Sequence, residues 1–322
     1  MQRALILAAS LAAATSVMRA QEHHERPAPD PFTLKPLAGG VHALYGRGGN
    51  VGFLAGTDGV LVVDSQFKDL APGILKKIQS VSDKPIKFLV NTHHHGDHVG
   101  GNDAFRSVAL IVGHDNVRAH MIASPAELQR DLPARIEEAR SAGNAERLQQ
   151  LTEQLEWAKK VKAVEIPAPV VTFQSELRIH VGDETVQIWH TPPAHTDGDS
   201  VVYFEKANVL HMGDLLFNKV IPVIDVRGGG SPKGYLAALD SVLARVPANV
   251  TIIPGHGELT DVSGVKALKQ YINDVIEAAR KAKAAGKSRD DFVKEVDLPA
   301  YKDYQGYPAR FKGNCGAAYD EL

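Results

Sequence analysis

Four side chains that bind metal ions well lie within one short segment of the chain. His93, His95, Asp97 and His98 follow directly after Ile86–Val90, a mostly apolar run typical of a buried strand. Three imidazoles and a carboxylate this close are costly to bury unligated, and the imidazoles would repel one another if protonated. A divalent cation resolves both problems, because it binds neutral imidazole and ionised carboxylate together. Nitrogen and oxygen donors without thiolate indicate Zn²⁺ first, with Fe or Mn behind it.

This segment resembles the His-x-His-x-Asp-His motif of the metallo-β-lactamase superfamily. The rest of the chain continues the likeness in the same order. Further candidates stand where predicted strands end: His195 within Pro-Ala-His-Thr-Asp, Asp214 within His-Met-Gly-Asp, and His256 within Pro-Gly-His-Gly. The resemblance extends from about Val41 to Gly257, which is most of the chain.

The resemblance implies two adjacent metal sites. The first is held by His93, His95 and His195, and the second by Asp97, His98 and His256. Asp214 resembles the carboxylate that bridges the two ions. Asp64, after the apolar run Val60–Val63, resembles an aspartate that steadies the ligand loop through hydrogen bonds. His94 falls in a variable position of the motif and is not a ligand there.

The resemblance implies a hydrolase in which a zinc-bound hydroxide opens a cyclic amide, ester or thioester of a small molecule. Asp97 is the expected catalytic residue, because it is placed to orient the hydroxide and to transfer its proton. β-Lactam hydrolysis is one candidate reaction. Asp214 keeps a lactonase or a glyoxalase II-like thioesterase open, because well-known zinc β-lactamases carry Cys or Ser in that region. A mono-iron persulfide oxygenase and a non-catalytic metal-binding module are the alternatives from other classes.

Arg227 is the candidate substrate contact outside the metal site. It lies in a segment with three successive glycines, Val226–Ser231, which permits a mobile rim next to the Asp214 loop. Its guanidinium would bind a substrate carboxylate. A plain turn that carries a solvated arginine is the alternative.

The elements that must position these side chains are strands mixed with helices, and the predicted fold class is α/β. The family likeness implies a four-layer αββα sandwich. Strands are predicted over 41–45, 51–55, 60–63, 86–90, 108–112, 177–181, 186–190, 201–205, 209–212 and 250–253. Helices are predicted over 70–81, 235–244 and 265–285, with a short one at 104–105, and the tail from Asp297 reads as irregular.

A segment of different character, about 116–162, interrupts the sheet-forming pattern. It is rich in Ala, Glu, Gln, Lys and Arg, and its apolar residues recur at helical spacing. Pro125 and Pro133 are expected to divide it into two or three helices. We interpret it as a helical insertion, which forms either a lid or rim of the cleft or a helix pair on the back of the sheet.

The ends of the chain and its composition limit the remaining possibilities. Residues 1–20 have the layout of a secretory signal peptide, 21–36 read as a linker, and 37–322 as the catalytic domain. We therefore expect a periplasmic or secreted protein without a membrane span in its mature part. A net charge of −2 over 322 residues gives no reason to expect a nucleic-acid partner. The lone cysteine, Cys315, excludes an internal disulfide. The oligomeric state stays open.

Overall fold

The computed structural model describes residues 30–322, so the predicted signal peptide and most of the predicted linker lie outside the described residues. The linker expected over 21–36 is too long, because Thr33–Pro36 forms strand β1 and pairs with β2. Within 30–322, no helix combines the length and the apolar character needed to cross a membrane.

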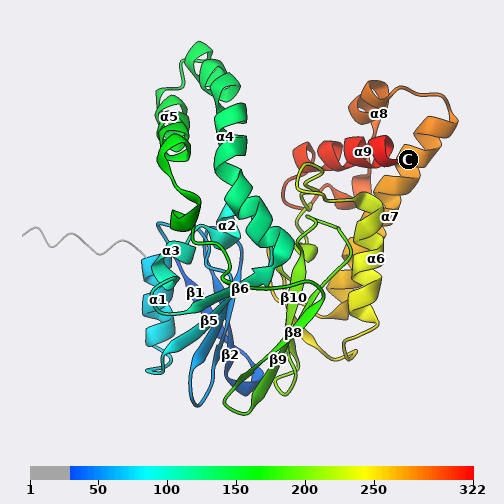
Figure 1. The fold of residues 1–322 in the computed structure, drawn as a ribbon. Helices are drawn as coiled ribbons and strands as arrows, with labels where there is room; N and C mark the ends of the chain where they lie inside the picture. The colour runs from blue at the N-terminus through cyan, green and yellow to red at the C-terminus, as the bar shows by residue number, and fades with distance from the viewer. Residues whose placement is uncertain (1–29) are drawn as a thin grey trace, which may run out of the picture. The chain divides into compact units, whose positions relative to one another are not determined.

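Two β-sheets form the centre of the fold (Figure 1). The first contains seven strands in chain order: β1, β2 (Val41–Tyr45), β3 (Val51–Ala55), β4 (Val60–Val63), β5 (Ile86–Asn91), β6 (Leu110–His114) and β7 (Val171–Phe173). The second contains five strands in the order β12 (Thr251–Ile253), β11 (Val209–His211), β10 (Ser200–Phe204), β9 (Glu184–His190) and β8 (Glu176–Val181). Strands β4 to β7 are parallel, as are β11 and β12.

Helices cover the outer faces of both sheets, which confirms the αββα sandwich. On the first sheet lie α1 (Ala71–Gln79) and α3 (Asn102–Phe105); α2 (Gly96–Val99) belongs to the ligand loop. On the second sheet lie α6 (Pro232–Leu243) and α7 (Val262–Ala284); α9 (Ala309–Glu321) packs on these two helices, and α8 (Arg289–Glu295) packs on α9. Short 3₁₀ turns are η1 (Ala38–Gly40), η2 (Ala163–Glu165), η3 (Gly213–Leu215) and η4 (Pro299–Tyr301).

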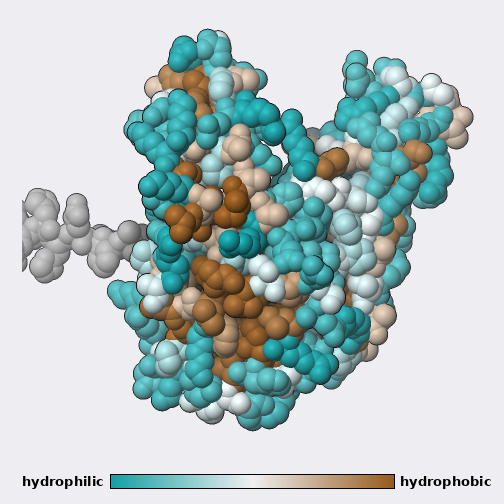
Figure 2. Space-filling view, in the orientation of Figure 1, coloured by the Kyte–Doolittle hydropathy of each residue, from teal (hydrophilic) through white to brown (hydrophobic). Residues whose placement is uncertain are grey.

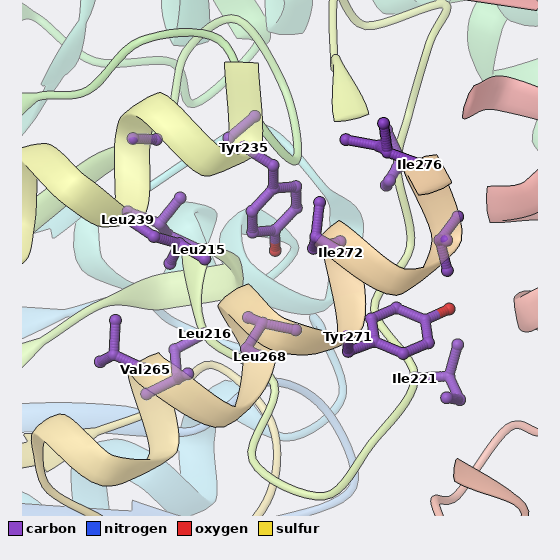
Figure 3. Close-up of a cluster of buried hydrophobic side chains, with 14 of the residues drawn as sticks. Leu215, Leu216, Ile221, Tyr235, Leu239, Val265, Leu268, Tyr271, Ile272 and Ile276 are labelled. Carbon is purple, nitrogen blue, oxygen red and sulfur yellow. The ribbon is translucent and has the colours of Figure 1, made fainter. Parts of the chain in front are cut away.

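The largest apolar core packs α6, α7 and α9 against the second sheet. Figure 3 shows Ile272 of α7 beside Tyr235 of α6, and Tyr271 of α7 near Ile221 in the segment after β11. The buried hydroxyl of Tyr235 donates a hydrogen bond to the carbonyl oxygen of Asp214 at 2.7 Å. The core thereby reaches the backbone of a candidate ligand.

The last part of the C-terminal tail is helical, so the expectation of an irregular tail from Asp297 holds as far as Pro308, apart from the turn η4, and is wrong beyond it. Helix α9 buries Phe311, Cys315 and Ala318 in the large core. Its interior glycines and aromatic residues obscure the helical pattern in the sequence, and tertiary packing overrides that weak local preference.

Helices α4 (Asp115–Ser141) and α5 (Ala145–Lys160) form an arm that projects from the sandwich (Figure 1). The arm has its own small core around Leu132, Ala139 and Leu151, and its outer surface is largely hydrophilic (Figure 2). Pro125 and Pro133 lie inside α4 and do not divide it, contrary to expectation. Each proline removes one backbone donor, yet the helix continues, and Leu132 next to Pro133 is buried with Leu151 of α5.

Because the core of the arm is separate, we predict that damage to it stays local. Leu132→Ala removes a fully buried side chain, a change that typically costs about 2–5 kcal/mol. Hydrogen exchange should become faster in α4 and α5 and stay unchanged in α6 and α7. Leu239→Ala, in the large core, is the matched control and should accelerate exchange there. Equal acceleration in both regions of Leu132→Ala would show that the arm is not an independent unit.

Two stacked histidines join the ends of the two sheets. The rings of His114, at the end of β6, and His190, at the end of β9, lie 3.8 Å apart between centroids. Burial and the neighbouring charge of His114 lower the pKa of His190 from its ordinary value of 6.5. The fold therefore disfavours the protonated ring.

We predict that this ring contributes to loss of stability in acid. The unfolded chain takes up a proton near pH 6.5, and the folded chain takes it up only at lower pH. The free energy of unfolding should therefore fall as the pH drops below 6.5, with a slope of at most about 1.4 kcal/mol per pH unit from this group. Urea titrations should show a shallower fall for His190→Phe and the wild-type slope for the exposed control His180→Phe. A wild-type slope in His190→Phe would exclude this contribution.

Candidate metal centre

The strand ends bring together all seven side chains that the sequence analysis names as metal ligands. His93 to His98 follow β5, His195 follows β9, Asp214 lies in η3 after β11, and His256 follows β12. They form two groups in which the candidate ligand atoms lie within 4.8 Å of one another. The first contains His93, His95, His195 and Asp214, and the second contains Asp97, His98 and His256.

The carboxylate of Asp214 connects the two groups. Its Oδ2 lies 3.8 Å from His93 Nε2 and 3.4 Å from His195 Nε2. Its Oδ1 lies 3.0 Å from His98 Nε2 and 3.3 Å from His256 Nε2. Since the side chain is only 4% exposed, solvent does not satisfy these oxygens. One oxygen therefore faces each group, which is the arrangement of a bridging ligand.

The protein fixes the outer nitrogens of the ligand loop through Asp64 and Thr92. His98 Nδ1 donates a hydrogen bond to Asp64 Oδ2 at 2.7 Å, and the Thr92 hydroxyl donates to the same oxygen at 2.7 Å. Because that hydroxyl proton is used, Thr92 Oγ1 accepts from His93 Nδ1 at 3.1 Å. In the neutral rings, the inner Nε2 atoms of His93 and His98 consequently carry lone pairs.

The same rule applies to the other two histidines of the first group. His95 Nε2 donates to Asp225 Oδ2 at 3.0 Å, and His195 Nδ1 donates to the carbonyl oxygen of Val223 at 2.6 Å. Carboxylate and carbonyl oxygens only accept, so each neutral ring has its lone pair on the other nitrogen. His95 Nδ1 and His195 Nε2 face each other at 2.9 Å. Two lone pairs at this distance repel each other unless a cation binds both nitrogens.

Atoms without hydrogen-bond partners provide a direct test of whether cations fit here. Among the described residues, His93 Nε2, His98 Nε2 and Asp214 Oδ1 are buried and have no hydrogen-bond partner. Buried polar atoms are rarely left this way. All three face the space between the two groups, and nitrogen and oxygen donors of this kind suit Zn²⁺, Fe²⁺ or Mn²⁺. The site fits divalent cations.

The electrostatics of the bare site lead to the same conclusion. Burial opposes protonation of His256, but the negative charge of Asp214 outweighs it and raises the pKa of His256 to about 9. Burial, aided by the positive charge of nearby histidines such as His95, lowers the pKa of His195 to about 4, even though Asp214 opposes the shift. A proton on His256 thus competes with a cation for the second group, whereas His195 of the first group is neutral at neutral pH.

Asp225 was missed in the sequence. It contacts His95 across 130 positions of the chain and stands in an otherwise unremarkable turn. Hydrogen bonds from its own backbone NH to the carbonyl oxygen of His195, at 2.9 Å, and from Gly228 NH to its Oδ1, at 3.0 Å, hold it in place. Only the acidic residue next to a glycine-rich segment offered a signal.

Two cavities flank the metal centre. One, of about 640 Å³, lies beside the first group and is lined by His94, His120, Glu127, Arg130, Asp131, Asp225, Arg227 and Gly228. The other, of about 840 Å³, lies beside the second group and includes Asp97, His256, Tyr45, Phe67, Arg47, Lys219 and Arg310. Helix α4 therefore forms part of the rim of the cleft, as one of the two interpretations of the insertion held. Arg227 is 87% exposed and pairs with Asp131 of α4 at 3.2 Å.

We predict that Asp64 strengthens metal binding without touching the metal. Asp64→Asn places an amide NH₂ or a single acceptor where the carboxylate now serves Thr92 and His98. Loss of such a partner typically weakens metal binding roughly 10–100-fold. Competition with a chromophoric zinc chelator measures the change. Asp58→Asn, at an exposed aspartate paired with Lys87, is the control and should bind as the wild type does. Equal affinity in both variants would contradict the role of Asp64.

Two curated proteins are similar to this chain over part of its length. Linear primary-alkylsulfatase of a Pseudomonas species is 26% identical over 268 residues, which cover 76% of this chain and 49% of that protein. Metallo-β-lactamase type 2 of Bacteroides fragilis is 24% identical over 116 residues, 36% of this chain and 47% of that protein. The chain thus spans about half the length of the curated relatives that it matches.

Solved structures show the same fold. A metallo-β-lactamase from Pontibacter korlensis superposes with a TM-score of 0.54 at 17% identity, covering 75% of this chain and 99% of that one. VMB-1 superposes with a TM-score of 0.55 at 15% identity, covering 77% and 99%. The family model described as the metallo-β-lactamase superfamily matches residues 44–256, a range that runs from β2 to His256. The chain belongs to the metallo-β-lactamase superfamily.

Proposed function

We propose that the protein is a hydrolase that uses two zinc ions to open a cyclic amide, ester or thioester. His93, His95 and His195 would hold the first ion, Asp97, His98 and His256 the second, and Asp214 both. The observation that carries the proposal is the split of the Asp214 carboxylate, with one oxygen toward each group. The same split favours two ions over the single iron of a persulfide oxygenase.

Two adjacent ions would acidify a water and polarise the group under attack. The protein's own contribution to the chemistry centres on Asp97. Its Oδ2 lies 3.3 Å from His256 Nε2, and its side chain is 25% exposed to the larger cavity. Burial opposes ionisation, but the hydrogen bond from His256 and the charge of His98 outweigh it and lower the pKa of Asp97. Asp97 is therefore ionised at neutral pH and able to accept a proton from a nucleophile and pass it to a leaving group.

Hydrolysis of a sulfate ester is a second candidate. The alkylsulfatase relative matches more of this chain than the β-lactamase relative does. The larger cavity combines the cationic side chains of Arg47, Lys219 and Arg310 with the rings of Tyr45 and Phe67. Such a lining suits a substrate with an anionic group and an apolar part.

Two further assignments belong to this proposal. Arg227 lines the smaller cavity, and its contact with a substrate carboxylate would require it to leave Asp131. Export to the periplasm rests on the apolar run over residues 4–17 alone.

We predict that zinc-loaded protein hydrolyses at least one member of a panel of chromogenic β-lactams, lactones, thioesters and alkyl sulfates. A chelator should abolish the activity, and added Zn²⁺ should restore it. Asp97→Asn should lower the rate roughly 10²–10⁴-fold, the usual effect of losing a general acid–base group. The exposed Asp103→Asn is the matched control and should keep the full rate.

The zinc content of each variant is measured alongside the rate, because Asp97 has two proposed roles. An Asp97→Asn protein that retains both ions and the full rate would refute proton transfer by Asp97. A wild-type protein that holds two zinc ions and turns over none of the panel would favour the non-catalytic metal-binding module.

A further inference from the structure

A third group of metal-binding side chains lies beside the first site. His94, His95 and Asp225 place their candidate ligand atoms within 4.8 Å of one another. His94 Nε2 lies 3.9 Å from Asp225 Oδ2, and His95 Nε2 lies 3.0 Å from the same oxygen. The group stands apart from the seven residues of the metal centre except for His95, which contributes its outer nitrogen here and its inner nitrogen there.

The surroundings of His94 leave room for an ion. His94 Nδ1 is buried without a hydrogen-bond partner among residues 30–322, and its Nε2 is too far from Asp225 for a hydrogen bond. His94, Asp225 and Gly228 line the cavity of about 640 Å³, from which water could complete a coordination shell.

Gly228 keeps the space between the two side chains open. A Cβ atom at this position would lie 2.5 Å from Asp225 Oδ2 and 3.0 Å from His94 Cε1. Any other residue would therefore crowd both potential ligands. This observation does not depend on the distances between the ligand atoms, and it indicates that the space between His94 and Asp225 is kept free of protein atoms.

We propose that His94, Asp225 and the Nε2 atom of His95 form a third cation site, which takes an imidazole-preferring divalent ion such as Cu²⁺. The inference rests on the proposed function, because His95 would then bridge this ion and the first zinc. Binding would displace the proton that His95 Nε2 donates to Asp225, and one proton would pass to solvent for each ion bound. Cu²⁺ is the strongest binder of nitrogen and oxygen ligands in the first-row series. An ion here would narrow the cavity beside the first site.

The test adds one equivalent of Cu²⁺ to zinc-loaded protein and measures both metals by elemental analysis after desalting. Electron paramagnetic resonance then reports the copper ligands. The wild type should retain two zinc ions, gain one copper and show coupling to nitrogen. His94→Phe removes a ligand, and Gly228→Ala fills the space, and neither variant replaces a residue of the metal centre. Both should lose the copper and keep the zinc, whereas the exposed control His180→Phe should keep all three ions.

Zinc content before copper is added separates this inference from the proposed function. Fewer than two zinc ions in the wild type would contradict the proposed function. Two zinc ions with no bound copper, copper that replaces zinc one for one, or copper retained by both His94→Phe and Gly228→Ala would each overturn the third site.

Discussion

A buried carboxylate among histidine lone pairs is the constraint on which this structure depends. Asp214 is almost fully buried, and its oxygens face the nitrogens of His93, His195, His98 and His256. Hydrogen bonds on the far side of His93, His95, His98 and His195 assign the outer protons, so the inner nitrogens of these rings have none to share when neutral. Positive charge must enter this space, either as a proton on His256, whose pKa the charge of Asp214 raises to about 9, or as metal ions. The fold thus holds an arrangement that is complete only with cations.

The rest of the fold serves this arrangement by aligning strand ends. Strands β4 and β5 are parallel, which brings Asp64, after β4, next to the ligand loop after β5. Strands β11 and β12 are also parallel, which brings Asp214, after β11, close to His256, after β12. Helices on both outer faces bury the sheets, and Tyr235 ties the large core to the backbone of Asp214. The arm adds a wall of charged residues from α4 and shapes access to the first group.

The features of this protein that the sequence predicts correctly are those that depend on residues close together in the chain. Apolar runs of strand length located most strands to within a few residues, and motif spacing identified seven side chains that the structure brings together. The continuity of α4 through two prolines and the helix α9 depend on burial of Leu132 and Phe311 against distant elements, which local pattern does not encode. The role of Asp225 was not predicted for the same reason, because its partner His95 is far away along the chain.

The most direct test of the account is anomalous diffraction from crystals of zinc-loaded protein, recorded at the zinc absorption edge. The account predicts two peaks, one beside each carboxylate oxygen of Asp214, with the three remaining side chains of each group around it. A single peak, or peaks that do not contact Asp214, would contradict the bridging role on which the account depends.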